Sequence, residues 1–149
     1  MSPGPGGAGI PFRATGLADL SALAALLADA CARVGAGDEA SADLRLAAEE
    51  VFTNIFRHGY RSGTGPVTVR VDATPARVVV TLADAAPDFD PASARAPDID
   101  AGLGQREPGG LGWHLVRQVM DEVKREPGAD GGNVYTLVRN LPPRGGSDG

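Results

Sequence analysis

Hydrophobic positions recur at helical spacing in two long stretches of the N-terminal half of the chain. In the first, residues 17–34, apolar side chains lie three and four positions apart, and Gly35 follows the last turn. The second stretch covers residues 38–58 and stops at Gly59. Its apolar stripe consists of Leu44, Ala47, Ala48, Val51, Phe52 and Ile55. This pattern predicts two consecutive helices, each with one face against a core.

Four shorter stretches predict strands, and the first two are rich in β-branched residues. Two of them, residues 67–71 and 78–82, follow the second helix. Two more, residues 122–126 and 133–140, follow a third predicted helix at 113–121. Helices that cover one face of a sheet form an economical assembly of two layers. We therefore expect an α+β fold, a two-layer α/β sandwich whose sheet is mixed but mostly antiparallel.

The first predicted helix is unusual because its outward face is mostly alanine rather than charged. A helix that is apolar nearly all round is usually buried on more than one side. Two interpretations stay open. The alanines reflect an alanine-rich sequence without functional meaning, or the helix lies at a dimer or partner interface.

Length and charge narrow the class of protein. The 149 residues fit one domain, which we place at residues 10–141, with disordered tails at 1–9 and 142–149. A net charge of −5 argues against a direct nucleic-acid surface or an anionic-membrane surface. Cys31 is the one cysteine, which fits a reducing compartment. With neither a signal peptide nor a membrane span in the sequence, we expect a soluble, cytoplasmic protein.

A carboxylate and an amide lie four residues apart in the second predicted helix, at Glu50 and Asn54. This spacing puts both side chains on one helix face, at the edge of the apolar stripe where a pocket wall would lie. Glu50 has the chemistry of a general base for an attacking hydroxyl, and the amide oxygen of Asn54 suits magnesium. Taken alone, such a pair is usually a solvated helix edge.

Asp84 follows the second predicted strand, where its carboxylate can accept a hydrogen bond from the exocyclic amine of adenine. A turn aspartate that caps the strand is the commoner role. A calcium loop through Asp84, Asp88 and Asp90 is excluded, because the glycine and the closing glutamate of such a loop are missing. Residues 85–108 then form a long irregular segment, which is typical of a functional lid or of disorder.

The turn Gly109-Gly110-Leu111-Gly112 opens the third predicted helix. Glycines let a phosphate approach the backbone closely, and the amides at a helix N-terminus donate to it. The turn is weak evidence by itself, because glycines also serve loop flexibility. It is not a Walker motif, since no Lys-Ser/Thr follows, and it is not a dinucleotide fingerprint, since no strand leads into it.

Along the chain, the helix with Glu50 and Asn54 comes first, then Asp84 with the long segment after it, and then the glycine turn. In this order they resemble the GHKL ATPases, the superfamily of DNA gyrase and the histidine kinases. The resemblance rests on EEVFTNIFRHGY at 49–60, on residues 84–91 and on GGLGWHLV at 109–116, and it covers about residues 12–141. The His-Gly-Tyr ending and the Phe-Asp-Pro segment at 89–91 are similar to the anti-sigma factor serine/threonine-protein kinase branch. The fold that the resemblance implies is the GHKL (Bergerat) sandwich.

The resemblance implies an ATP- and magnesium-dependent kinase that phosphorylates a STAS-type anti-sigma factor antagonist. In its free state the kinase would sequester a sigma factor, and it would form a homodimer. Glu50 would be the general base, Asn54 the magnesium ligand and Asp84 the adenine-binding residue. Gly109, Gly110, Leu111 and Gly112 would shape the phosphate site.

Two charged side chains are weaker candidates for the same site. His58 continues the helix face of Asn54 and would line the nucleotide site, although a helix-terminal histidine bonded to backbone is an equally good interpretation. Arg106 would reach the phosphates from residues 85–108, unless it is simply a solvated charge.

Two positions depart from the family pattern. Ala86 stands where the family usually has a glycine, and a Cβ there would weaken ATP binding by on the order of 1 kcal/mol. The pair Gly132-Asn133 replaces Gly-Thr, although asparagine can still donate a hydrogen bond. Two other hypotheses stay open: a partner-switching binding module with a degenerate ATP site, and the ATP-binding domain of a sensor histidine kinase. The latter has less support, because the sequence shows no dimerisation helix with a phospho-accepting histidine.

Overall fold

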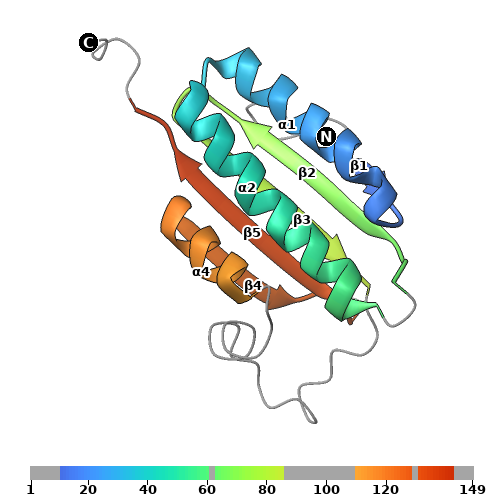
Figure 1. Cartoon of the computed structure of the whole chain (residues 1–149). Coiled ribbons are helices and arrows are strands. Elements are labelled where there is room, and N and C mark those ends of the chain that lie inside the picture. The colour runs from blue at the N-terminus through green and yellow to red at the C-terminus, as the bar shows by residue number, and fades with distance from the viewer. Residues whose placement is uncertain (1–10, 61–62, 86–109, 129–130, 143–149) are drawn as a thin grey trace.

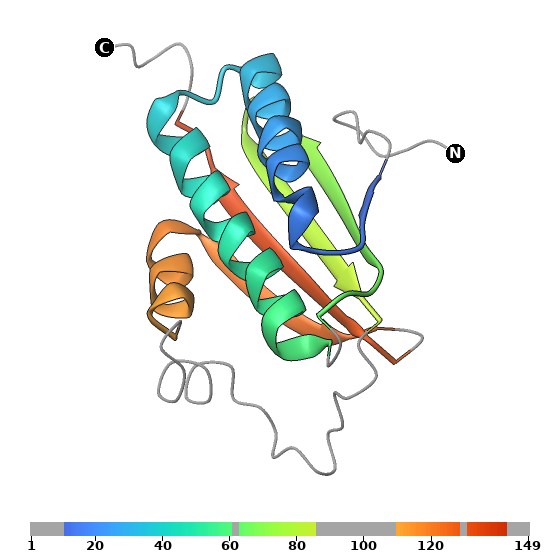
Figure 2. The same cartoon turned by 45° about the vertical axis from the view of Figure 1, so that its right-hand side comes forward.

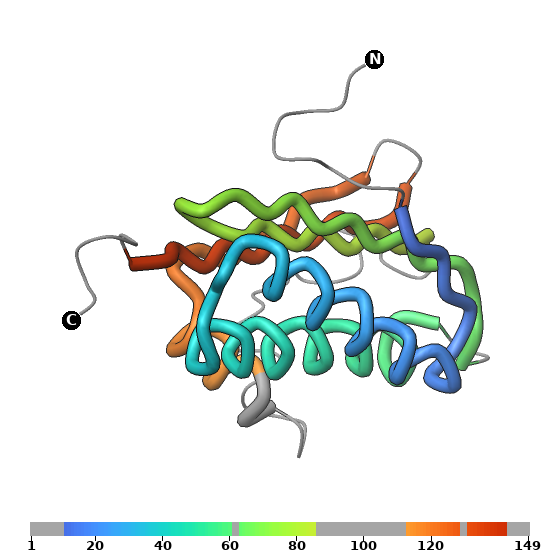
Figure 3. Tube along the Cα trace, turned by 90° about the horizontal axis from the view of Figure 1, so that it is seen from above, coloured from blue at the N-terminus to red at the C-terminus, as the bar shows by residue number. Residues whose placement is uncertain are grey.

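The computed structural model describes residues 11–60, 63–85, 110–128 and 131–142. Within these ranges the chain forms two layers, a five-stranded sheet and a layer of helices on one of its faces (Figure 1). Figure 3 shows the two layers edge-on, with the strands on one side and the helices on the other. The α+β two-layer fold expected from the sequence is confirmed.

The sheet is built in the order β1-β2-β3-β5-β4, and all four of its pairings are antiparallel. Its strands are β1 (Phe12–Ala14), β2 (Val67–Ala73), β3 (Arg77–Asp84), β4 (Glu122–Pro127) and β5 (Asn133–Asn140). The four predicted strands are therefore present. The first strand was not predicted, because three residues are too few to show an alternation. It is defined only by its pairing with β2.

Three α-helices cover the sheet within the described residues: α1 (Leu20–Val34), α2 (Asp38–Asn54) and α4 (Gly110–Val119). A short 3-10 helix, η1 (Leu17–Asp19), leads into α1, and a π-helix, η2 (Ile55–Gly59), continues α2. The chain leaves α1 at Gly35, whose φ of 67° is the left-handed conformation that glycine adopts without strain. Among the described helices, none has the length and apolar character needed to cross a bilayer.

The core lies between α2 and the sheet. The whole predicted stripe is buried, from Leu44 in α2 to Ile55 at the start of η2, and it shares one core cluster with valines of β2 and β3. Three aromatic rings extend this core toward the end of α2. Phe52 and Phe56 meet edge to face at 5.0 Å between centroids, and Tyr60 follows at 6.0 Å from Phe56.

The antiparallel order brings distant segments of the chain to one end of the molecule. Asp84, the last residue of β3, is paired directly with Asn133, the first residue of β5. The C-terminal end of α2 and the N-terminal end of α4 lie at this same end (Figure 2). We call it the β3–β5 end, because every predicted site residue inside the described ranges belongs to an element that ends or begins there.

Candidate functional site

The end of α2 supplies the acid and the amide that the sequence singled out. Glu50 and Asn54 are both half-buried, at the edge of the buried stripe. The Nδ2 of Asn54 donates a hydrogen bond of 2.8 Å to the backbone oxygen of Glu50. Because the amino group of the amide is engaged in the helix, the carbonyl oxygen remains as its ligand atom. Oxygen is the donor type that magnesium prefers.

Asp84 is held from the neighbouring strand. It is 9% exposed, and its Oδ1 accepts hydrogen bonds from the backbone N–H of Asn133 at 3.1 Å and from the Nδ2 of Asn133 at 3.3 Å. The prediction ended this strand at Leu82, but β3 continues to Asp84 because its pairing with β2 and β5 persists to that residue. The predicted role of a strand-end carboxylate therefore has a fixed geometry.

Gly132 is a point of close approach beside Asp84. A Cβ at this position would overlap the carbonyl oxygen of Asp84 and lie 2.7 Å from the Cα of Ala85. The sequence pattern marked Gly132 only as half of an altered Gly-Thr pair. Its structural role is to let the turn before β5 pack against the end of β3.

Tyr60 ties the end of the π-helix to the residue after Asp84. Its hydroxyl accepts a hydrogen bond of 2.8 Å from the N–H of Ala85 and donates one of 2.6 Å to the carbonyl oxygen of Pro66. Burial raises the pKa of the Tyr60 hydroxyl, the Ala85 N–H lowers it, and the negative charge of Asp84 raises it further. Sequence reasoning assigned no role to Tyr60, although the residue closes the His-Gly-Tyr ending that carried the resemblance.

Replacing Tyr60 with phenylalanine is expected to lower the free energy of unfolding by about 1–3 kcal/mol. The estimate is two lost hydrogen bonds at about 0.5–1.5 kcal/mol each. Urea unfolding of both proteins at pH 7 measures the difference. An unchanged urea midpoint would show that the hydroxyl does not hold the chain at Ala85.

The pH dependence of stability provides an independent check on Tyr60. A pKa raised in the folded state stabilises the fold below the unfolded value of about 10, and this contribution is lost as the pH rises through the folded value. Above about pH 10, the wild-type free energy of unfolding should therefore fall more steeply than that of Tyr60→Phe.

The helix α4 begins within the predicted glycine turn rather than after it. Gly110, Leu111 and Gly112 form its first turn, although glycine has a low helix propensity and the pattern placed the start at Trp113. Trp113 is 3% exposed and packs on Tyr135 of β5 at 6.0 Å between ring centroids. The first turn of a helix has unsatisfied backbone N–H groups, which suit an anion.

The remaining predicted residues are placed less closely or not at all. His58 is exposed and lies in the π-helix one turn beyond Asn54. Gly109, Ala86, Arg106 and nearly all of the predicted lid lie outside the described residues, as do almost all residues of both predicted tails. Their roles stay predictions.

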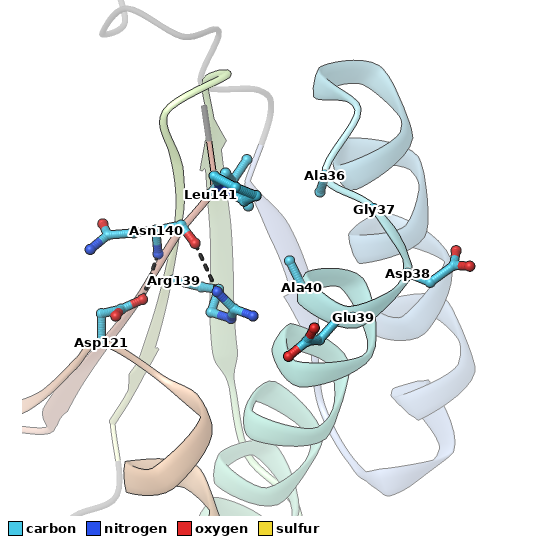
Figure 4. A pocket seen from close by; sticks show the side chains of 10 residues that line it. Ala36, Gly37, Asp38, Glu39, Ala40, Asp121, Arg139, Asn140 and Leu141 are labelled. Atoms are coloured by element: carbon cyan, nitrogen blue, oxygen red, sulfur yellow. Dashed lines mark hydrogen bonds between the residues drawn. The ribbon is translucent and has the colours of Figure 1, made fainter. Parts of the chain in front are cut away.

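A cavity of about 510 Å³ lies at the opposite end of the sheet, beside the N-terminus of α2 (Figure 4). Glu39 and Asp121 contribute carboxylates to its lining, whereas the carboxylate of Asp38 points away from it. The guanidinium of Arg139 is engaged by Asp43, with Nε and Nη2 at 3.1 and 2.9 Å from one carboxylate oxygen. A triphosphate would be repelled by this set of charges. We therefore place the candidate nucleotide site at the β3–β5 end.

Comparison with known proteins gives a matching family model and several relatives. The model of a family described as the histidine kinase-like ATPase domain matches residues 14–139. The serine-protein kinase RsbW of Bacillus licheniformis is 32% identical over 109 residues, which is 66% of this chain. The chain spans 64% of the length of that relative.

Two more relatives have similar names. The serine/threonine-protein kinase BtrW of Bordetella bronchiseptica is 30% identical over 101 residues, or 67% of this chain and 70% of the relative. The serine-protein kinase RsbW of Staphylococcus aureus is 27% identical over 117 residues, or 73% of this chain and 74% of the relative.

Proposed function

Because the chain belongs to the histidine kinase-like ATPase family, we propose that it is an ATP-dependent serine/threonine-protein kinase that acts as an anti-sigma factor. The relatives named above are serine or serine/threonine kinases, which supports the activity. The observation that carries the proposal is the shared location of the ends of α2 and β3 and the first turn of α4 (Figure 2), with the buried Asp84 as the last residue of β3.

The described residues fit ATP. The Oδ1 of Asn133 is buried beside Asp84 and has no hydrogen-bond partner among the described residues, so this end has an acceptor for a hydrogen bond from a ligand. Asp84 would accept a hydrogen bond from the adenine amine. The first turn of α4, from Gly110, would bind the phosphates, and the Oδ1 of Asn54 would hold magnesium.

Glu50 would act as the general base. When bound, ATP with magnesium supplies the phosphoryl group that is transferred. The carboxylate of Glu50 would accept the proton of a serine hydroxyl. At the same time the serine oxygen would form the new bond to the terminal phosphorus, and the bond from that phosphorus to ADP would break. Glu50 lies one helical turn before Asn54, so the base and the metal ligand share one face of α2.

The proposal extends to the partners and the location of the kinase. In its free form the protein would bind a sigma factor, and a STAS-type antagonist would compete for the shared surface until its own serine is phosphorylated. The outward face of α1 supports a surface for a partner or for a second copy, because Ala22, Ala25, Ala28 and Ala32 are exposed. A homodimer and a cytoplasmic location stay predictions.

A direct experiment is to incubate the protein with ATP, magnesium and a candidate antagonist. Mass spectrometry should then find phosphoserine or phosphothreonine on the antagonist and ADP in solution. In Asn54→Ala we expect slower transfer and a higher magnesium concentration for half-maximal rate, because a metal ligand is lost. Equal rates at every magnesium concentration would remove Asn54 from the metal site.

The second candidate function is a binding module that holds its partner without phosphorylating it. The observation in its favour is Ala86, which lies outside the described residues. Calorimetry and thermal unfolding with ATP and magnesium separate the two functions. A ligand at 100 times its dissociation constant adds about 2.7 kcal/mol to stability, so the absence of both heat and thermal shift at millimolar ATP would favour the binding module.

A further inference from the structure

The side chain of Asn133 is buried beside Asp84 and is only half satisfied. It is 4% exposed, and its Nδ2 donates to the Oδ1 of Asp84 at 3.3 Å. Its own Oδ1 has no hydrogen-bond partner among the residues that the structure describes. Buried polar atoms are rarely left without a partner, so this oxygen calls for an explanation.

The orientation of this amide follows from the chemistry of its neighbour. An ionised carboxylate only accepts hydrogen bonds, so an amide beside it must turn its NH₂ toward the carboxylate. The opposite orientation would place the amide oxygen of Asn133 against an oxygen of Asp84. The unpartnered atom is therefore an acceptor, and a donor from a bound ligand would satisfy it.

The position of the amide is also fixed. Asn133 and Asp84 are register partners at the end of the sheet, and the backbone N–H of Asn133 donates to the same carboxylate oxygen at 3.1 Å. On one side Gly132 packs against the backbone of Asp84 and Ala85. On the other side the Tyr60 hydroxyl holds the N–H of Ala85 at 2.8 Å. The two side chains, which we call the Asp84–Asn133 pair, thus form a preorganised unit.

We propose that the Oδ1 of Asn133 is a specificity-determining acceptor, which accepts the second hydrogen of the exocyclic amine whose first hydrogen is bound by Asp84. This inference rests on the proposed function, since it takes the ligand to be ATP. A 6-amino purine has two N–H donors on one nitrogen, which matches two acceptors contributed by adjacent strands. A 6-keto purine has a carbonyl oxygen in place of the amine, and this oxygen would face the acceptor oxygens of Asp84 and Asn133. The Asp84–Asn133 pair therefore disfavours a 6-keto purine. A threonine hydroxyl, which the family pattern has here, can donate as well as accept, whereas the Oδ1 of asparagine only accepts.

The test uses ATP analogues that lose the amine hydrogens one at a time. Dissociation constants are measured by calorimetry for ATP, for N6-methyl-ATP with one N–H, and for purine riboside triphosphate with none. In the wild type we expect affinity to fall about tenfold at each step, the order expected for one net hydrogen bond. In Asn133→Leu, the step from ATP to N6-methyl-ATP should vanish, while the step to purine riboside triphosphate should persist.

A purely structural role for Asn133 would give a different pattern. If the amide only orients Asp84, Asn133→Leu should reduce the affinity difference between N6-methyl-ATP and purine riboside triphosphate. The affinity difference between ATP and N6-methyl-ATP should then be unchanged. That result would overturn the inference. Thr136→Val is the matched control, because Thr136 lies on the same strand but, by the alternation of β5, on the uncovered face of the sheet. All three constants should be unchanged in this variant.

Two other outcomes are decisive as well. If Asn133→Leu does not fold, as judged by circular dichroism, Asn133→Thr is measured with the same analogues. The threonine hydroxyl can occupy the place of the amide. We expect this variant to keep its preference for ATP over GTP, with a smaller affinity difference between ATP and N6-methyl-ATP. An unchanged step in Asn133→Thr would overturn the inference. If wild-type protein binds none of the three nucleotides at millimolar concentration, the proposed function itself fails, whereas binding without any effect of residue 133 refutes the inference alone.

Discussion

Replacing Glu50 with glutamine is expected to slow phosphoryl transfer to the antagonist by roughly 100- to 10,000-fold, the usual contribution of a positioned general base. Glutamine keeps the shape of the side chain but cannot accept the proton of the attacking hydroxyl. Binding of ATP should be unaffected, because Glu50 is proposed to contact the hydroxyl rather than the base or the magnesium. Single-turnover transfer of labelled phosphate and calorimetry with ATP measure the two quantities separately.

Glu49→Gln is the matched control for this experiment. Glu49 is the preceding residue of α2 and pairs with Arg45 at 2.8 Å on a neighbouring face of the helix. Its replacement should leave transfer within a factor of about two, since an exposed i, i+4 pair contributes only about 0.3–0.5 kcal/mol. A similar loss of rate in both variants would mean that Glu50 has no special role. A normal rate in Glu50→Gln would remove the proposed base.

The second large effect is expected for Gly132→Ala. The added Cβ would meet the carbonyl oxygen of Asp84 and lie 2.7 Å from the Cα of Ala85, and both atoms belong to backbone that cannot rotate away. Overpacking of a well-packed site costs about 1–3 kcal/mol, and a clash with backbone belongs at or above the upper end of that range. Relief of the clash has to displace Asp84, so ATP affinity should fall together with the free energy of unfolding.

Gly16→Ala provides a control with room for the new methyl group. Gly16 has an extended backbone with a φ of −172°, and its added Cβ would lie 3.5 Å from the Cγ2 of Thr64, an ordinary contact. Urea unfolding and calorimetry of both variants with ATP should therefore show a large loss only for Gly132→Ala. Wild-type stability of Gly132→Ala would indicate that the turn before β5 is not packed against β3.

Most elements of the fold could be predicted from the sequence because their hydrophobic periods are long. The stripe from Leu44 in α2 to Ile55 at the start of η2 extends over about three turns, and all of its apolar positions are buried. The last strand was predicted at residues 133–140, and β5 covers the same residues. β1 could not be found in this way, because its three residues gain their structure from β2 and carry no period of their own.

The candidate site was only partly accessible to sequence reasoning. Helical spacing predicts that Glu50 and Asn54 lie on one helix face, and the end of the predicted strand before it predicts that Asp84 lies at one end of the sheet. The hydrogen bond between Ala85 and Tyr60 joins residues 25 positions apart, and the hydrogen bond between Asn133 and Asp84 joins residues 49 positions apart. Spacing within a single element contains no information on such pairs. The first depends on how the end of η2 meets the end of β3, and the second on the antiparallel register of β3 and β5, and only the folded chain defines either.

The most direct test of the account is a crystal structure of the protein with magnesium and a non-hydrolysable ATP analogue. We expect the adenine amine against Asp84 and Asn133, the phosphates at the first turn of α4, and magnesium on Asn54 with Glu50 facing the terminal phosphate. A nucleotide in the cavity beside Arg139 would contradict the account. So would Glu50 and Asn54 side chains that face away from the phosphates.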